Sequence, residues 1–454
     1  MDVNSRRNFI KQSVLGSLVF GAAEWRGSGQ AAVTTPLRQG KTVLGLRCEP
    51  IPTVRIGVIG LRRGGSAVYR LARIEGTHIV AIDDLLPERV ADCQTNLNNA
   101  GRPEAFAYSK EEDWKKMCER DDIDLIYNAT PWDLHVPIAL YAMRHGKHVA
   151  VEVPAALTVK DCWALVDTAE KTQRHCMMLE NCCYDFFELT TLNMARHDVF
   201  GEIYHGECAY IHDLRTSVGS GHWRVEHSKK HTGNPYPTHG LGPVAQIMGI
   251  NRDDRFEYLN SMSTNQYGMS LYAEHKFGKD SSAAKETYKL GDMNTTMVHT
   301  QNGHTIMIQH DVTSPRPYDR IHKISGTKGY AVKYPEEKIA LEPHAHEFLK
   351  PEELKALIEK YQHPLINYIG EQAKAVGGHG GMDYIMDWRL IYCLRNGLPL
   401  DQDVYDAAAW SSIVELSERS VLNRSGSVDV PDFTRGEWKN AKPRQIIDMI
   451  NIFS

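Results

Sequence analysis

A glycine-rich segment, GVIGLRRGG at residues 57–65, is the first part of the chain whose residue types could do chemistry. It follows a short β-branched run, TVRIGVIG, and a helix is predicted to follow from Gly65 to Ile74. Gly60 permits a tight turn there, and Gly64 and Gly65 allow the helix amides to approach a pyrophosphate closely. A second predicted strand, HIVAIDD, ends in acid about twenty residues later, so that Asp84 can accept hydrogen bonds from an adenosine ribose.

The charged residues near this segment indicate whether it binds NAD or NADP. A carboxylate at Asp84, with Asp83 as the less favoured candidate, repels a 2′-phosphate and favours NAD over NADP. Arg62 and Arg63 complicate this reading, because either arginine could bind such a phosphate, and Arg62 stands where the dinucleotide fingerprint has its second glycine. The predicted cofactor is NAD, and the residues of the segment predicted to bind it are Gly60, Leu61, Arg62, Arg63, Gly64 and Asp84.

Strands and helices alternate around the glycine-rich segment. DLIYNAT at residues 124–130 has the pattern of a strand, and residues 134–153 read as helix, stop and strand, with Gly146 as the helix end. Thr158 and Asp161 have the spacing of a capping box that opens the next helix. This order predicts a doubly wound parallel sheet, a Rossmann domain, over residues 54–178.

The pattern changes in the second half, residues 179–454. Asn302 and Gly303 separate two strand-like runs, which is a strong hairpin signal, and residues 321–334 have the pattern of a further hairpin. Helical patterns return near Tyr384–Asn396 and Val404–Ser420. The predicted second domain is α+β, with a large, mainly antiparallel open sheet that binds substrate. Its last helices are candidates to pack back on the Rossmann domain.

The N-terminus has the character of an export signal. Arg6 and Arg7 precede an apolar run at residues 14–23, which is too short to span a bilayer but suits a signal peptide. Paired arginines resemble a twin-arginine signal. We expect a signal peptide at residues 1–32, an extended arm at residues 33–53, and a periplasmic protein without a transmembrane helix in the mature chain.

Composition narrows the class of partner. The 454 residues carry a formal net charge of −5, without a basic or acidic block, so that nucleic acid is not an expected partner. Nine cysteines show no repeated spacing, and the histidines show no ligand spacing, so no metal is predicted. The expected ligand is a small molecule.

Several motifs together resemble a known group of enzymes. Those of the first half are VRIGVIG, IDDLLPERV, NATPWDLH and VEVP; those of the second half are LENCCY (179–184), IHDLR (211–215), YPTHGLGP (236–243), HDVTSPRPY (310–318), GGHGGMDY (377–384) and PDFTRGEWKNAK (431–442). The first set resembles the Gfo/Idh/MocA oxidoreductases. The second resembles one branch of them, the α-N-acetylgalactosaminidases of glycoside hydrolase family 109.

The resemblance implies a redox-assisted glycosidase. Terminal α-linked N-acetylgalactosamine, or a related sugar, would be cleaved by transient oxidation at carbon 3, elimination, water addition and re-reduction. NAD would be tightly bound and recycled, because no net redox change occurs. The resemblance also implies a homo-oligomer, a dimer.

The resemblance also assigns roles to residues. Tyr184 and His239 are the candidates for proton handling, and which of them takes the proton from carbon 2 stays open. Residues implied to bind substrate are Glu152, Tyr184, Arg224, Tyr236, His239 and Tyr318. Residues implied to complete the cofactor site are Trp132, His135 and Glu152.

One departure keeps alternatives open. Related oxidoreductases carry Glu-Lys-Pro where this chain has Glu152, Val153 and Pro154. An exported sugar oxidoreductase of the glucose–fructose oxidoreductase type is the first alternative, although it would lack that lysine. A sugar-binding protein with a vestigial cofactor site is the second.

Overall fold

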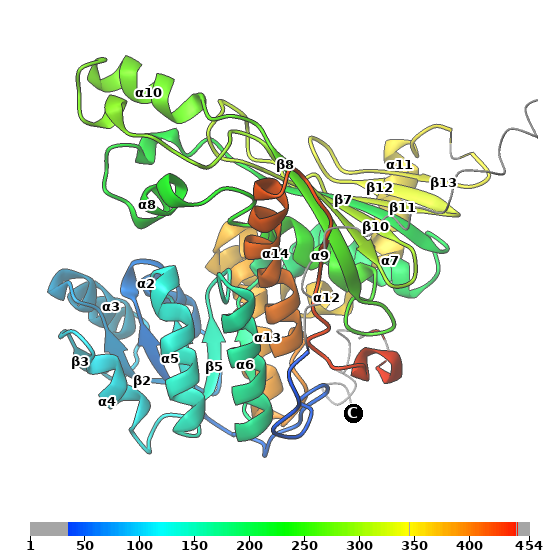
Figure 1. Cartoon of the computed structure of the whole chain (residues 1–454). Helices are drawn as coiled ribbons and strands as arrows, with labels where there is room; N and C mark the ends of the chain where they lie inside the picture. The colour runs from blue at the N-terminus through cyan, green and yellow to red at the C-terminus, as the bar shows by residue number, and fades with distance from the viewer. Residues whose placement is uncertain (1–34, 345, 442, 444–454) are drawn as a thin grey trace, which may run out of the picture. The chain divides into compact units, whose positions relative to one another are not determined.

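The computed structural model describes residues 35–344, 346–441 and 443 (Figure 1). The predicted signal peptide lies outside them. Residues 35–53, most of the predicted arm, form no helix or strand, and Arg38 in this arm is hydrogen-bonded to Glu170 and Glu437. No helix among the described residues is long and apolar enough to cross a membrane.

The first sheet is parallel throughout, with the strand order β3-β2-β1-β4-β5-β6. Its strands are β1 (Val54–Ile59), β2 (Thr77–Asp83), β3 (Phe106–Tyr108), β4 (Leu125–Asn128), β5 (His148–Val151) and β6 (Cys176–Met178). The helices of this domain are α2 (Leu61–Leu71), α3 (Pro87–Asn99), α4 (Asp113–Cys118), α5 (Trp132–Arg144) and α6 (Val159–Thr172). The strand order is that of a doubly wound sheet, which confirms the predicted Rossmann fold.

Local signals in this domain act as predicted, with one difference. Thr158 Oγ1 accepts the backbone N–H of Asp161 at 3.1 Å and so caps α6. Helix α2 begins at Leu61, whereas the sequence pattern placed its start at Gly65. The Gly64 N–H already bonds to the Gly60 carbonyl at 3.0 Å, so the glycine-rich segment is itself the first turn of the helix.

The second sheet has eight strands in the order β13-β12-β11-β7-β10-β9-β8-β14, and only its β7–β10 pair is parallel. Its strands are β7 (Ile203–Ile211), β8 (Phe256–Ser263), β9 (Asn294–Thr300), β10 (Thr305–Asp311), β11 (Lys323–Gly326), β12 (Gly329–Val332), β13 (Lys338–Leu341) and β14 (Val428–Asp429). Both predicted hairpins form, as β9–β10 and β11–β12. The mainly antiparallel sheet confirms the predicted α+β class.

Helices surround this sheet and extend from it. They are α7 (Phe186–Arg196), α8 (Trp223–Lys230), α9 (Thr238–Ile247), α10 (Gly268–Phe277), α11 (Pro351–Tyr361), α12 (Pro364–Val376), α13 (Met382–Arg395) and α14 (Val404–Leu422), with five short 3₁₀ turns, η1 (Asn181–Tyr184), η2 (Arg215–Ser217), η3 (Ala283–Lys285), η4 (His379–Gly381) and η5 (Glu437–Asn440). Figure 1 shows α8 and α10 on a projection above α2, and α13 and α14 between the two sheets.

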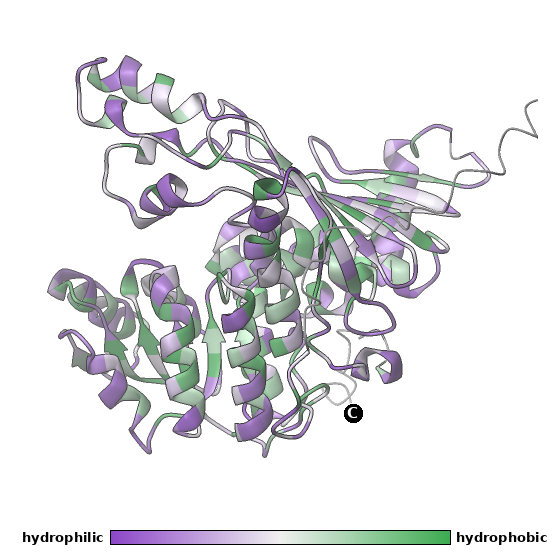
Figure 2. Cartoon of the chain, viewed as in Figure 1, coloured by the Kyte–Doolittle hydropathy of each residue, from purple (hydrophilic) through white to green (hydrophobic). Residues whose placement is uncertain are grey.

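Helices α13 and α14 join the two sheets into one core. Arg70 of α2 is paired with Asp387 of α13 at 2.7 Å, and the Ala155 N–H bonds to Ser411 Oγ of α14 at 3.1 Å. Apolar residues are concentrated in the strands and along these two helices, while the outer helices of the Rossmann domain present polar faces (Figure 2). The two domains therefore pack through buried contacts, which fix the loops at the carboxyl ends of the parallel strands.

Candidate active site

A cavity of about 730 Å³ lies at the carboxyl ends of β1, β2, β4 and β5. The loops that follow these strands supply one side of it, with Gly60, Asp84, Trp132 and Glu152. Residues of α8, α9 and the second sheet supply the other side. Ligands of doubly wound folds bind at this edge, because the loops there meet in a crevice.

The glycine-rich turn has the conformation that a dinucleotide site needs. Gly60 has φ +86°, and a Cβ there would lie 2.6 Å from the carbonyl oxygen of Ala129, so only glycine fits. Asp84 accepts the Leu61 N–H at 2.7 Å and the Leu86 N–H at 3.0 Å, which fixes its carboxylate at the cavity wall. The first-turn amides of α2 have no partners within the helix and can receive an anion.

Asp83, the less favoured ribose candidate, does not line this cavity. Replacing it with asparagine should raise stability at alkaline pH. Burial raises the pKa of Asp83 to about 7, and the charges of Asp113 and Asp84 add to the rise. The pKa of this carboxyl in the unfolded chain is about 3.9, so the free energy of unfolding falls as pH rises from about 4 to 7.

The measurement is thermal unfolding of wild type and Asp83→Asn across this pH range. The variant should melt at a higher temperature than wild type at pH 8, and the difference should shrink as pH falls toward 4. A difference that does not change with pH would contradict a buried, ionising Asp83.

The two arginines of the turn differ in their surroundings. Arg63 Nε donates to Glu152 Oε1 at 3.1 Å, and its Nη2 lies 3.5 Å from Asp383 Oδ2. Arg62 lines the cavity and has no hydrogen bond or ion pair with any described residue. Arg63 is thus held by two carboxylates, while Arg62 keeps its charge available for a ligand.

Trp132 and His135 are fixed against the loop that carries Val153. Trp132 Nε1 donates to the Val153 carbonyl at 3.1 Å. The His135 ring lies between two carbonyl oxygens, that of Pro154 at 2.8 Å from Nδ1 and that of Thr130 at 2.9 Å from Nε2. These contacts hold both rings at the cavity wall, where the sequence placed cofactor contacts.

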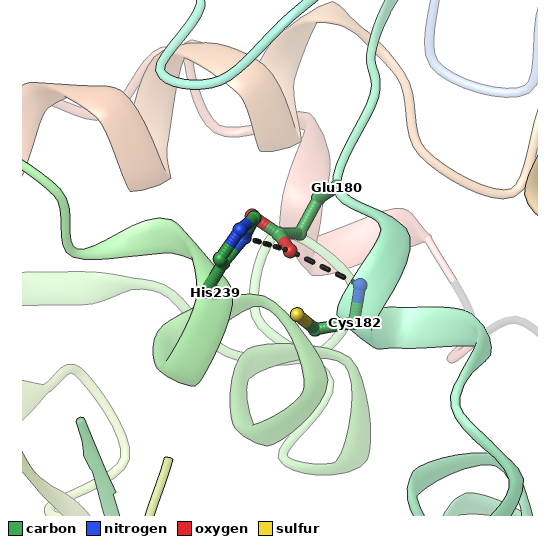
Figure 3. Close-up of side chains that lie close together, drawn as sticks. All are labelled: Glu180, Cys182 and His239. Carbon is green, nitrogen blue, oxygen red and sulfur yellow. Dashed lines mark hydrogen bonds and ion pairs between the residues drawn. The ribbon is translucent and has the colours of Figure 1, made fainter. Parts of the chain in front are cut away.

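His239 is the group at the cavity best arranged to move a proton. Its Nδ1 lies 2.8 Å from Glu180 Oε1 (Figure 3). Its Nε2 lies 3.4 Å from the Tyr236 hydroxyl. Burial opposes ionisation of Glu180, but His239 and hydrogen bonds keep the pKa of this carboxyl below its usual value. An ionised Glu180 accepts a hydrogen bond from the Nδ1–H of His239. The lone pair of Nε2 is then the one that faces the cavity.

Glu180, Cys182 and His239 present three ligand-type atoms within 4.8 Å of one another (Figure 3). Glu180 Oε1 is engaged by His239 and by the Cys182 backbone N–H at 3.2 Å. Burial raises the pKa of the Cys182 thiol well above its usual value, and its Sγ lies 3.6 Å from Asn181 Oδ1. The group is arranged as a hydrogen-bonded cluster that supports His239.

Another part of the cavity wall consists of aromatic rings that surround the guanidinium group of Arg224. The Arg224 guanidinium lies 4.6 Å from the ring centre of Tyr236, 5.1 Å from that of Trp223 and 5.4 Å from that of Trp132. Its Nε is buried and has no hydrogen-bond partner among the described residues. Tyr210 packs against Tyr236 with ring centres 4.6 Å apart. Such a wall offers faces for stacking and one polar handle for a ligand.

Four of the predicted site residues lie away from the cavity surface. Tyr184 is buried, and its hydroxyl donates to Asp401 Oδ2 at 3.2 Å, while Asp401 is also held by Arg389. Tyr318 packs edge-on against Tyr210 and accepts from Arg320 at 3.2 Å. Leu61 contributes its N–H to Asp84, and Gly64 lets α2 pack on Val58. The position of Tyr184 gives no support to a proton-handling role.

The remaining predicted residues are brought together at the cavity: Gly60, Arg62, Arg63, Asp84, Trp132, His135, Glu152, Arg224, Tyr236 and His239. Sequence reasoning missed others that line it: Tyr210, His222, Trp223, His227, His310 and His379. Tyr210, His310 and His379 lie within or beside motifs of the sequence analysis, which is the signal that could have identified them. The directions of their side chains depend on packing between distant segments.

Comparison with known proteins identifies the family. Residues 54–180 match the NAD-binding Rossmann fold of an oxidoreductase family, GFO_IDH_MocA, and residues 184–440 match the glycosyl hydrolase 109 C-terminal domain. An α-N-acetylgalactosaminidase of Bacteroides fragilis is 54% identical over 416 residues, which cover 90% of this chain and 98% of that protein. A glycosyl hydrolase family 109 protein of Shewanella amazonensis is 47% identical, covering 98% and 99%.

Solved structures with the same fold are more distant in sequence. A levoglucosan dehydrogenase in complex with NADH and L-sorbose has 20% identity and a TM-score of 0.65, covering 84% of this chain and 100% of its own. An aldose-aldose oxidoreductase from Caulobacter crescentus has 16% identity and a TM-score of 0.61, covering 83% and 100%. The predicted resemblance is confirmed. The chain belongs to glycosyl hydrolase family 109, as a glycoside hydrolase built on an NAD-binding Rossmann domain.

Proposed function

We propose that this glycosidase cleaves terminal α-linked N-acetylgalactosamine, or a related sugar, by an NAD-dependent route in which the cofactor is retained. The observation that supports the proposal is that one cavity is lined both by the loops of the Rossmann sheet and by His239, which is paired with Glu180. The B. fragilis relative named α-N-acetylgalactosaminidase supports the choice of sugar.

The residues at the sheet edge fit NAD. Gly60 and the first turn of α2 would hold its pyrophosphate, and the fixed carboxylate of Asp84 would receive ribose hydroxyls and repel a 2′-phosphate. Bound NAD supplies reversible hydride transfer at carbon 3 of the sugar, and the resulting ketone acidifies the hydrogen on carbon 2. Because no net oxidation results, the same cofactor serves successive turnovers.

His239 then provides the base for carbon 2. Glu180 accepts a hydrogen bond from the Nδ1–H of His239 and so fixes the tautomer, which makes Nε2 the atom that accepts a proton at the cavity. Burial raises the pKa of Tyr236, so its phenol stays protonated and can donate toward Nε2 or a sugar oxygen. Glu180 is a positioning residue here, since it acts through His239.

The aromatic wall and Glu152 position the sugar. Tyr210, Tyr236 and Trp223 present ring faces to a pyranose, and Arg224 provides a donor for an oxygen of the sugar or its N-acetyl group. Glu152 Oε1 is held by Arg63, which orients the carboxylate toward a hydroxyl. Oriented binding of this kind lowers the entropic part of the barrier.

We also propose export by the twin-arginine route to the periplasm, which the paired Arg6 and Arg7 ahead of a short apolar run support.

A dimer is proposed as well. Tyr258, Met262 and Met297 are exposed on one face of the second sheet, where β8 and β9 pair, and such a patch favours association. Size-exclusion chromatography with light scattering tests the dimer.

The catalytic proposal is tested with purified enzyme, 4-nitrophenyl α-N-acetylgalactosaminide, deuterated water and no added cofactor. We expect release of nitrophenol together with deuterium at carbon 2 of the freed sugar, because a base removes that hydrogen in the course of reaction. NADH that accumulates with free sugars, without release of nitrophenol, would instead identify a sugar oxidoreductase.

A further inference from the structure

Five consecutive residues between α12 and α13 have left-handed backbone conformation. Their φ angles are 88° at Gly377, 89° at Gly378, 45° at His379, 75° at Gly380 and 112° at Gly381. The four glycines adopt such angles readily, whereas His379 has a Cβ and does not. A side chain kept in this conformation indicates that the surroundings require that residue there.

The loop delivers His379 to the cofactor end of the cavity. His379 lines the cavity together with Gly60, Arg62 and Arg63. The loop is packed tightly beneath it, since a Cβ at Gly378 would lie 2.8 Å from Asp383 Cβ and 3.1 Å from Arg70 Cδ of α2. The histidine therefore comes from the C-terminal domain but lies beside the helix turn that receives a pyrophosphate.

A hydrogen bond to Asp383 fixes the imidazole of His379. His379 Nδ1 lies 2.9 Å from Asp383 Oδ2, and Asn181 Nδ2 donates to Asp383 Oδ1 at 2.6 Å. Burial opposes ionisation of this carboxyl, but His379 and the charges of Arg70 and Arg63 hold its pKa well below the usual value. An ionised Asp383 accepts a hydrogen bond from the Nδ1–H of His379, which leaves the Nε2 edge of the ring for a ligand.

We propose that His379 is a cofactor-binding residue, which contacts the pyrophosphate of NAD from the C-terminal domain and slows its release. The inference rests on the proposed function, in which NAD is retained. With Asp383 as the acceptor at Nδ1 and a phosphate oxygen as the acceptor at Nε2, both ring nitrogens of His379 have a hydrogen-bond partner. Arg62, which has no partner among the described residues, adds a cation on the same side.

The test is the rate at which NAD leaves the full-length holoenzyme. Wild type and the variants His379→Gly and His344→Ala are loaded with NAD, separated from free nucleotide, and sampled for bound NAD over time. Glycine removes the imidazole and suits the left-handed backbone, so the loop keeps its conformation. His344 is exposed and does not line the cavity, which makes it the matched control.

We expect His379→Gly to release NAD roughly tenfold to a hundredfold faster than wild type, which is the loss of one hydrogen bond to a charged group. Without NAD, His379→Gly should still unfold in one cooperative transition, at a temperature somewhat below that of NAD-free wild type, because the buried Asp383 loses the hydrogen bond from His379. His344→Ala should match wild type in both measurements. Release by His379→Gly at the wild-type rate would overturn the inference. Faster release from a variant that has lost its cooperative unfolding transition would also overturn it, because His379 would then act on the fold.

Rapid release from wild type itself would count against retention and therefore against the proposed function. The ratio of the two release rates would still decide the role of His379. The two proposals can thus fail separately.

Discussion

Replacing His239 with glutamine should reduce nitrophenol release from 4-nitrophenyl α-N-acetylgalactosaminide by roughly 10²–10⁴-fold, which is the range that general acid–base groups contribute. Glutamine can still donate to Glu180 and keep the local hydrogen bond, but it has no basic nitrogen to accept a proton near neutral pH. The cofactor edge should be unaffected, because His239 lies on α9 of the second domain and not in the loops of the Rossmann sheet. Single-turnover release and NAD content of the same preparation are the measurements.

Tyr184→Phe is the matched comparison, because its motif made it an equal candidate for proton handling. The Tyr184 hydroxyl donates to Asp401, which Arg389 also holds, at 2.8 Å and 3.1 Å, and this second contact does not depend on the hydroxyl. We expect near wild-type turnover and a stability loss of about 1 kcal/mol, which is the net value of a typical hydrogen bond. A drop in turnover as large as that of His239→Gln would return Tyr184 to the reaction.

The sequence predicted best those features that are set by local chemistry. Asn302 and Gly303 specified a tight turn, and the β9–β10 hairpin forms around them. The glycine at position 60 specified a positive φ after a buried strand, and the parallel sheet follows from the alternation of strands and helices. In each case neighbouring residues carry enough information to fix the backbone.

Side-chain direction was beyond such reasoning. Tyr184 lies in a 3₁₀ turn between the two domains, and whether its ring faces the cavity or Asp401 depends on α13 and the loop that follows it. Similarly, Arg63 carries a charge that could suit a 2′-phosphate, but Glu152 and the distant Asp383 hold it. Spacing in the chain cannot show contacts between residues that are 89 or 320 positions apart.

The valine in the VEVP motif also acquires a physical explanation. Val153 is buried at the cavity wall, and its carbonyl orients Trp132. It has no ionisable group, so position 153 cannot supply the base that a lysine would provide in a net dehydrogenase. The arrangement of His239 and Glu180 shows how the base can come from the second domain, on the side where the sugar is expected.

Gly60→Ala should abolish NAD retention and destabilise the protein by about 1–3 kcal/mol from backbone strain alone. Gly60 has φ +86°, and the added Cβ would lie 2.6 Å from the Ala129 carbonyl oxygen and 2.7 Å from the Thr130 nitrogen. These are backbone atoms at the end of β4, so relief requires that the first turn of α2 move away from the sheet. Because the amides of that turn are the expected pyrophosphate donors, stability and binding should fall together.

Gly65→Ala provides the control within the same motif. A Cβ at Gly65 would meet only Cys93 Sγ, at 3.5 Å, and the residue lies inside α2 with ordinary helical backbone. Alanine there should therefore stabilise the helix by about 0.5–1 kcal/mol and leave NAD bound. If Gly65→Ala released NAD as readily as Gly60→Ala, close approach of the cofactor at position 65 would be the cause, and the motif would act through contact at both glycines. If neither variant affected NAD, the dinucleotide would not bind at this turn.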